Sequence, residues 1–160
     1  AEPAVSRGMT VSRAYYTLDG AKIDLASANG GSSKVSQNQR LVVVVKVKVD
    51  ESSGRVLLVD RLPAGFEIEN PRLVSSGDLS ALHWLRPNFS PDHTEFRDDR
   101  FVAAFNFLRA GNKQRSATVA YVVRAVTPGR FTHPAAIVED MYRPDKFART
   151  AAGRLTIEPR

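Results

Sequence analysis

The amino-acid sequence predicts an all-β protein, an antiparallel β-sandwich with about seven to nine strands and little helix. Apolar residues recur at every second position, turn residues separate these stretches at short intervals, and no long stretch has a helical period. Two antiparallel sheets packed face to face bury such alternating faces. The chain has no cysteine, so it lacks the paired cysteines of an immunoglobulin domain and we expect another sandwich topology.

Four segments show the alternation most clearly. From Leu41 to Val49 every odd position is apolar, whereas Lys46 and Lys48 lie on the opposite face. A strand that is buried on one face has this pattern. Similar apolar faces predict the other core strands, at residues 101–107, 119–125 and 155–157.

Further strands are predicted where the pattern is shorter, at residues 9–18, 56–62 and 131–138, with weaker pieces at 66–69 and 93–96. Gly, Pro, Asp, Asn and Ser punctuate these segments, and such residues favour tight turns. We therefore predict turns at residues 51–54, 98–99, 110–113 and 127–129.

Two long connections interrupt the strands. Residues 26–39 are rich in Gly, Ser and Asn, which predicts a mobile loop with little to bury. Residues 70–91 differ because they carry large apolar side chains, namely Leu79, Leu82, Trp84, Leu85 and Phe89. We expect this segment to cover one end of the sandwich, with a helical turn near residues 78–82 and Trp84 as its anchor.

The length of 160 residues predicts one domain with a single core. We expect a disordered N-terminal segment over residues 1–7 and one sandwich domain over residues 8–160. No stretch approaches the ~20 apolar residues of a membrane span. The opening lacks the basic and apolar regions of a signal peptide, so we expect either that one was removed or that the chain is part of a longer protein.

The net charge of +6 raises nucleic acid as a partner, but the distribution of charge argues against it. Basic residues are scattered, and many have an acidic neighbour in sequence, as in Asp60-Arg61, Arg97-Asp98 and Asp99-Arg100. There is no basic run and no aromatic RNA-binding pattern. A solvated, arginine-rich surface is the favoured interpretation.

No metal or cofactor site is predicted. The densest group of potential ligands lacks the spacing and the glycine of an EF-hand; it comprises Asp92, His93, Glu95, Asp98 and Asp99. With Arg97 and Arg100 beside them, the two aspartates are more typical of a charged turn. His83 and His133 have no zinc-type partner three or four positions away.

Catalysis is not predicted either. The sequence has no nucleophile elbow and no phosphate-binding loop. Glu139 and Asp140 are adjacent, and neighbours on an extended segment point to opposite sides, so the two carboxylates do not converge on one bond. We expect a protein that is not an enzyme.

One segment contradicts the usual chemistry of loops. After a strand that ends near Val138, two carboxylates are followed by Met141 and Tyr142 and then by a turn containing Pro144. Surface loops are usually built from small polar residues. Either the Met-Tyr pair folds back to cap its own core, or it covers a site on something else.

Several motifs resemble the last macroglobulin-like module of bacterial alpha-2-macroglobulins. The most specific is the segment Glu139-Asp140-Met141-Tyr142-Arg143-Pro144, followed by residues 149–155. Upstream, residues 62–71 and 95–101 are also similar to that module, and the motifs occur in the family's order. The resemblance runs from about residue 8 to residue 157.

The resemblance implies a function. Alpha-2-macroglobulins trap proteases, and many carry an internal thioester that bonds to the attacking protease. In the bacterial family this module packs on the thioester domain, where the Met and Tyr corresponding to Met141 and Tyr142 shield the thioester from water. The family implies target proteases and a penicillin-binding protein as partners, and a periplasmic parent anchored to the inner membrane by a lipid. In members without a thioester the loop would be only an interdomain contact.

A free-standing sandwich that binds carbohydrate or a cell-envelope protein is the alternative. A sugar platform needs two or three exposed, coplanar rings. Tyr15, Tyr16 and Trp84 are the candidates.

Overall fold

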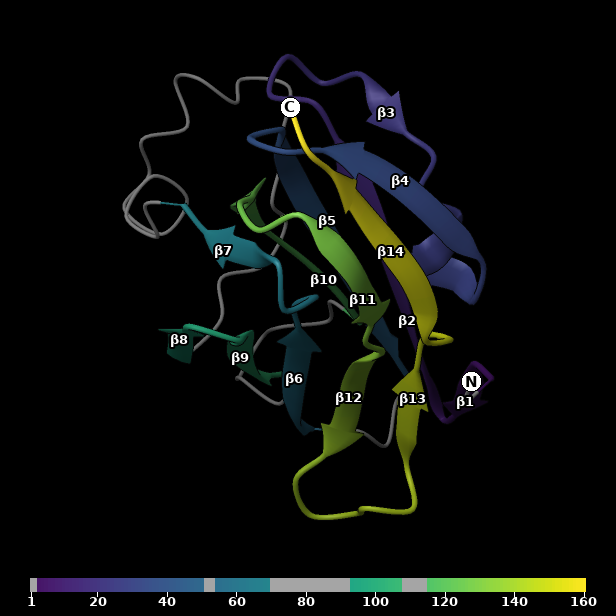
Figure 1. Cartoon of the computed structure of the whole chain (residues 1–160). Coiled ribbons are helices and arrows are strands. Elements are labelled where there is room, and N and C mark those ends of the chain that lie inside the picture. Colours follow the sequence, from purple (N-terminus) through teal and green to yellow (C-terminus); the bar gives the residue numbers. More distant parts are fainter. Residues whose placement is uncertain (1–2, 51–53, 70–92, 108–114) are drawn as a thin grey trace.

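The protein is built from three β-sheets (Figure 1). The computed structural model describes residues 3–50, 54–69, 93–107 and 115–160. The first sheet has the order β1 (Val5–Arg7), β13 (Phe147–Arg149), β12 (Ala136–Asp140), β6 (Arg55–Arg61), β9 (Arg100–Asn106) and β8 (His93–Arg97). The second has the order β3 (Lys22–Ile23), β2 (Met9–Tyr16), β5 (Arg40–Val49), β10 (Ser116–Ala125) and β7 (Phe66–Ile68). The third comprises β11 (Gly129–His133), β14 (Gly153–Glu158) and β4 (Ser32–Ser36).

These sheets confirm the all-β, mainly antiparallel sandwich. The described residues form fourteen strands, so the predicted seven to nine was too low, because short edge strands and interrupted strands leave little periodic signal. The only helical element in the described part of the chain is a short 3-10 turn, η1 (Ala26–Asn29). Nothing helical there has the length and hydropathy that a membrane span requires.

The core lies between the first two sheets. Phe101 of β9 stacks on Tyr121 of β10 with ring centroids 4.8 Å apart, which joins the two sheets directly. All five odd positions predicted on β5 are buried, and β14 adds Leu155 and Ile157 to the same apolar cluster. The alternating faces therefore predicted the core correctly.

The single strand predicted over residues 131–138 is two strands in two different sheets. β11 pairs with β14, whereas β12 pairs with β6 and β13. The break falls at Pro134, which has no N–H to donate to a ladder and is confined to edges and strand ends. β11 and β12 follow one another along one path in Figure 1, as do β13 and β14.

The prediction of a mobile loop over residues 26–39 is wrong. This segment contains η1 and then β4, which pairs in parallel with β14. Ser27, Ala28 and Val35 are buried. A Cβ on Gly153 would lie 2.2 Å from the backbone oxygen of Ser27. The small residues therefore serve close packing in this segment, although their composition resembles that of a flexible loop.

The N-terminal segment also differs from expectation. Residues 5–7, expected to be disordered, form β1 and extend the first sheet by pairing with β13. The guanidinium of Arg7 also lies 5.5 Å from the ring centroid of Phe147. A strand of three residues is too short to show a period, which explains why sequence alone missed it.

Several predictions fall outside the described residues. They are the turn over residues 110–113, most of the turn over residues 51–54, and the whole segment 70–91 with its Trp84 anchor and His83. The predicted turn at residues 98–99 is present between β8 and β9.

Candidate functional site

The loop between β12 and β13 projects from one end of the molecule, at the bottom of Figure 1. β12 ends at Asp140 and β13 begins at Phe147. The Oδ1 atom of Asp140 accepts hydrogen bonds from the backbone N–H groups of Tyr142 (2.8 Å) and Arg143 (3.0 Å). An aspartate that bonds its own backbone two residues ahead fixes a turn. The conformation of the loop is therefore set by Asp140.

Further hydrogen bonds hold the loop at its base. The N–H of Met141 donates to the carbonyl of Arg55 (2.9 Å), and the N–H of Asp140 donates to the carbonyl of Lys146 (3.0 Å). The Nζ of Lys146 forms an ion pair with Asp50 at 2.8 Å. The loop is thus tied to β6 through the backbone of Met141 and to Asp50 through the side chain of Lys146, while the side chains of Met141 and Tyr142 are left at the surface.

Met141 and Tyr142 are the exposed large hydrophobic residues of the described chain, with 46% and 72% of their surface accessible. Of the two alternatives left open by the sequence, the one in which this pair caps its own core is therefore wrong. Glu139, Arg143 and Pro144 are exposed beside them. Asp140 is the exception in the motif, because it is buried and its carboxylate faces the loop itself. We call the exposed set, Glu139 and residues 141–144, the tip.

At the end of the hairpin opposite the tip, Arg13 of β2 anchors its two strands. Its Nη2 atom donates to the carbonyl of Pro134 (2.9 Å) and lies 3.5 Å from the hydroxyl of Thr150. Thr150 Oγ1 in turn accepts the N–H of Ala136 (2.9 Å). One buried guanidinium therefore contacts the residues just before β12 and just after β13, the two strands that position the tip.

Arg13 is neutralised by Asp60 of β6. Its Nη1 lies 2.6 Å from Oδ1 of Asp60, and both side chains are 1% exposed. The hydroxyl of Tyr121 donates to Oδ2 of the same carboxylate. Burial, and then the negative charge of Asp60, raises the pKa of Tyr121, so this hydroxyl keeps its proton and stays a donor. A buried charge pair requires such additional hydrogen bonds to offset its desolvation.

A second polar group, centred on His133 of β11, joins the third sheet to this region. Its Nε2 lies 2.7 Å from the hydroxyl of Tyr15, and its Nδ1 lies 2.7 Å from the hydroxyl of Ser27. Burial, followed by the charge of Arg13, lowers the pKa of His133 to about 3. The imidazole is therefore neutral at physiological pH, with one ring nitrogen donating and the other accepting.

This histidine makes stability depend on pH. An unfolded histidine has a pKa near 6.5, so between about 6.5 and about 3 the unfolded chain binds a proton that the folded protein does not. We expect the free energy of unfolding to fall as the pH is lowered through that window, by at most about 1.4 kcal/mol per unit, and to be independent of this group above it. Urea titrations across the window should give a flatter profile for His133→Gln than for the native chain. Identical profiles would contradict this role of His133.

The sequence contained a signal for these buried charges that we did not use. Arg13 lies at a core-facing position between Val11 and Tyr15, and Asp60 lies between Leu58 and Leu62. A charged residue on each of two apolar faces predicts a buried partner. The sequence analysis noted only that Asp60 is next to Arg61 and Arg97 next to Asp98. In the structure Asp60 pairs with Arg13, and Arg97 pairs with Glu95. Only the Asp99–Arg100 pair forms as expected.

The other candidate groups do not converge. Among the described residues, no three His, Asp or Glu side chains lie together in a way that could hold a metal; Asp92 lies outside that set. Glu139 is exposed and Asp140 buried, so they lie on opposite faces of β12, as predicted. Tyr15 is only 3% exposed and bonded to His133, which removes it from the proposed sugar platform.

A family model, a curated relative and solved structures that resemble this chain all come from the same protein family. Residues 8–145 match the family model of the bacterial alpha-2-macroglobulin MG10 domain. The alpha-2-macroglobulin of Escherichia coli K12 is 40% identical over 125 residues, which cover 73% of this chain and 7% of that protein. Its native conformation superimposes with a TM-score of 0.80 at 32% identity, over 99% of this chain and 10% of the other.

A Salmonella alpha-2-macroglobulin that had reacted with methylamine superimposes with a TM-score of 0.75 at 30% identity, again over 99% of this chain and 10% of the other. The chain thus spans less than a tenth of the length of the curated E. coli relative.

Proposed function

We propose that this chain, which belongs to the bacterial alpha-2-macroglobulin family as its MG10 domain, is a non-catalytic docking module whose tip covers the thioester of the parent protein. The observation that carries the proposal is the tip. A methionine and a tyrosine, both exposed, stand on a loop whose backbone is fixed by hydrogen bonds and whose hairpin is anchored on a buried arginine.

The chemistry of the two side chains suits a cover. Methionine adapts to irregular surfaces, and tyrosine combines a large apolar face with one polar group. Together they exclude water from a small area and still make a hydrogen bond. Because the backbone of the loop is already fixed before docking, little conformational freedom is lost when the two side chains dock, and this favours binding.

The parent's activity is part of the same proposal. Structures of the E. coli relative include forms activated by trypsin and by porcine elastase. We infer that the parent of this chain is likewise a protease trap, and that this module keeps the reactive group unexposed until cleavage. In this proposal the parent is a periplasmic, lipid-anchored protein, as the resemblance implies.

Oxidative footprinting tests the docking directly. Hydroxyl radicals modify exposed Met and Tyr side chains, so Met141 and Tyr142 should be oxidised readily in the 160-residue chain and be protected in the full parent. Met9 is 4% exposed and is the other methionine of the chain, so it provides an internal control that should be slow in both. Equal oxidation of Met141 in chain and parent would count against a docked tip.

A further inference from the structure

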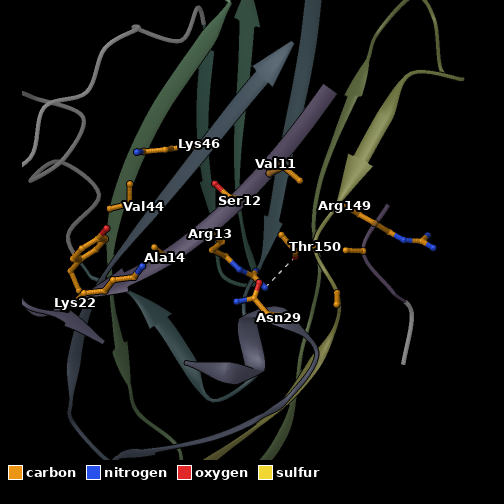
Figure 2. A pocket seen from close by; sticks show the side chains of 13 residues that line it. Val11, Ser12, Arg13, Ala14, Lys22, Asn29, Val44, Lys46, Arg149 and Thr150 are labelled. Atoms are coloured by element: carbon orange, nitrogen blue, oxygen red, sulfur yellow. Dashed lines mark hydrogen bonds between the residues drawn. The ribbon is translucent and has the colours of Figure 1, made fainter. Parts of the chain in front are cut away.

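A pocket of about 560 Å³ lies beside β2, away from the tip. Figure 2 shows Val11, Ser12, Arg13 and Ala14 along this strand, with Lys22 and Lys46 on one side and Arg149 and Thr150 on the other. Ser12 and Ala14 are small, so the strand forms a shallow floor between longer side chains. The pocket uses none of the tip residues.

The floor of this pocket includes an edge of β2 that, for most of its length, pairs with no other described strand. β2 pairs along its length with β5, but on its other side it pairs with β3 only at Tyr15 and Tyr16. In an antiparallel ladder alternate residues direct N–H and C=O to opposite sides. The N–H of Thr17 bonds Ala21 on the β3 side, and the N–H of Asp50 bonds the carbonyl of Gly8 on the β5 side.

This alternation assigns the odd residues of β2 to the open edge. The backbone groups of Val11 and Arg13 therefore point into the pocket, and no described residue pairs with them there. Arg13 supports this assignment, because the whole residue is 6% exposed while its side chain is 1% exposed. Its accessible part is the main chain.

The pocket is also positively charged. Lys22, Lys46 and Arg149 line it, and none of the described lining residues has a carboxylate. Within the described part of the chain neither lysine forms an ion pair. The charge of Arg13 is already neutralised by Asp60, so we assign the positive field in the pocket to Lys22 and Lys46. An open edge with charges around it recognises an extended peptide of opposite charge.

We propose that this pocket binds an extended acidic segment of another part of the parent polypeptide, which adds to β2 as an extra strand. Backbone hydrogen bonds to Val11 and Arg13 set its register, and carboxylates at alternate positions face Lys22 and Lys46. The source within the parent rests on the proposed function, in which this chain is one module of a longer protein; most of a relative's length lies outside the matched region. A linked segment reaches effective concentrations on the order of millimolar, so modest affinity is enough.

A peptide titration tests the recognition chemistry without the parent. The probe is a blocked hexapeptide, Thr-Glu-Val-Glu-Val-Thr, added to the ¹⁵N-labelled chain to concentrations on the order of millimolar. We expect saturable shifts of the amides of Val11 and Arg13 and slower hydrogen exchange at both. The same peptide with Gln in place of Glu should bind about tenfold more weakly.

Charge variants supply the matched control. Lys46→Glu should abolish most of the binding, whereas Lys48→Glu, on the same face of β5 but outside the pocket, should leave it nearly unchanged. Equal effects of the two variants, or shifts that avoid Val11 and Arg13, would overturn the proposal.

A comparison of the chain with its parent tests the source. The amide of Val11 should exchange more slowly in the full parent than in the 160-residue chain, and Lys22→Glu/Lys46→Glu should remove that protection. Unchanged exchange in the parent would overturn the assignment of the partner segment. This result is separable from the docking of the tip, because oxidation of Met141 reports on the tip alone.

Discussion

Replacing Asp60 with asparagine is expected to lower the free energy of unfolding by about 3–5 kcal/mol, because breaking a buried ion pair leaves an uncompensated charge. In the variant, Arg13 would keep its charge in a site that is closed to solvent. In the native chain the side chains of Arg13 and Asp60 are each 1% exposed. The amide oxygen of the introduced asparagine would still accept the hydrogen bond of the Tyr121 hydroxyl, so the loss reports mainly on the guanidinium. Urea unfolding followed by circular dichroism measures it.

Two further variants test whether that loss of stability comes from the buried ion pair. Asp99→Asn removes an ion pair at the surface, where such pairs contribute little, and should leave the urea midpoint almost unchanged. Arg13→Met/Asp60→Asn removes both charges and should recover part of the loss, since an apolar replacement of a buried pair is often neutral. If Asp60→Asn were as mild as Asp99→Asn, the anchor assigned to Arg13 would be untenable.

The local pattern of apolar residues explains which parts of the fold and of the tip could be predicted from the sequence. Alternation with a period of two depends only on neighbouring positions, so the apolar faces of β5, β9 and β10 were predictable and are buried as expected. The exposed Met141 and Tyr142 could also be singled out, because such residues conflict with ordinary loop chemistry. The family resemblance then favoured a docking role over burial.

Long-range partners were not predictable in the same way. Arg13 and Asp60 are 47 positions apart, and no local pattern states which cation meets which carboxylate. The prediction for residues 26–39 failed for another reason. Their small side chains allow a close approach to Gly153, and composition alone does not distinguish close packing from flexibility. The open edge of β2 depends on strand order, which a single sequence does not reveal.

The second large effect concerns the tip in the full parent. Under the proposed function, in which the tip covers a thioester of the parent, Met141→Ala/Tyr142→Ala should speed the reaction of that thioester with water and small amines by about tenfold or more, which corresponds to ~1.4 kcal/mol of lost protection. The reason is that alanine leaves the covered surface open to solvent. Met141→Leu/Tyr142→Phe keeps the apolar volume and should protect nearly as well as the native pair.

The stability of the chain itself provides the control. Met141 and Tyr142 are exposed, so the double alanine variant should melt close to the native chain. Phe105→Ala, by contrast, truncates a side chain that is 2% exposed and should cost about 3–5 kcal/mol. This comparison separates a surface tip from a core pair.

The most direct test of the account is the rate at which methylamine is incorporated into the full parent, compared between the native protein and Met141→Ala/Tyr142→Ala. We predict slow incorporation in the native parent, rapid incorporation in the variant, and matching melting temperatures for the two forms of the 160-residue chain. No incorporation into the native parent, or equal rates together with a strongly lowered melting temperature of the variant chain, would contradict the shielding role of the tip.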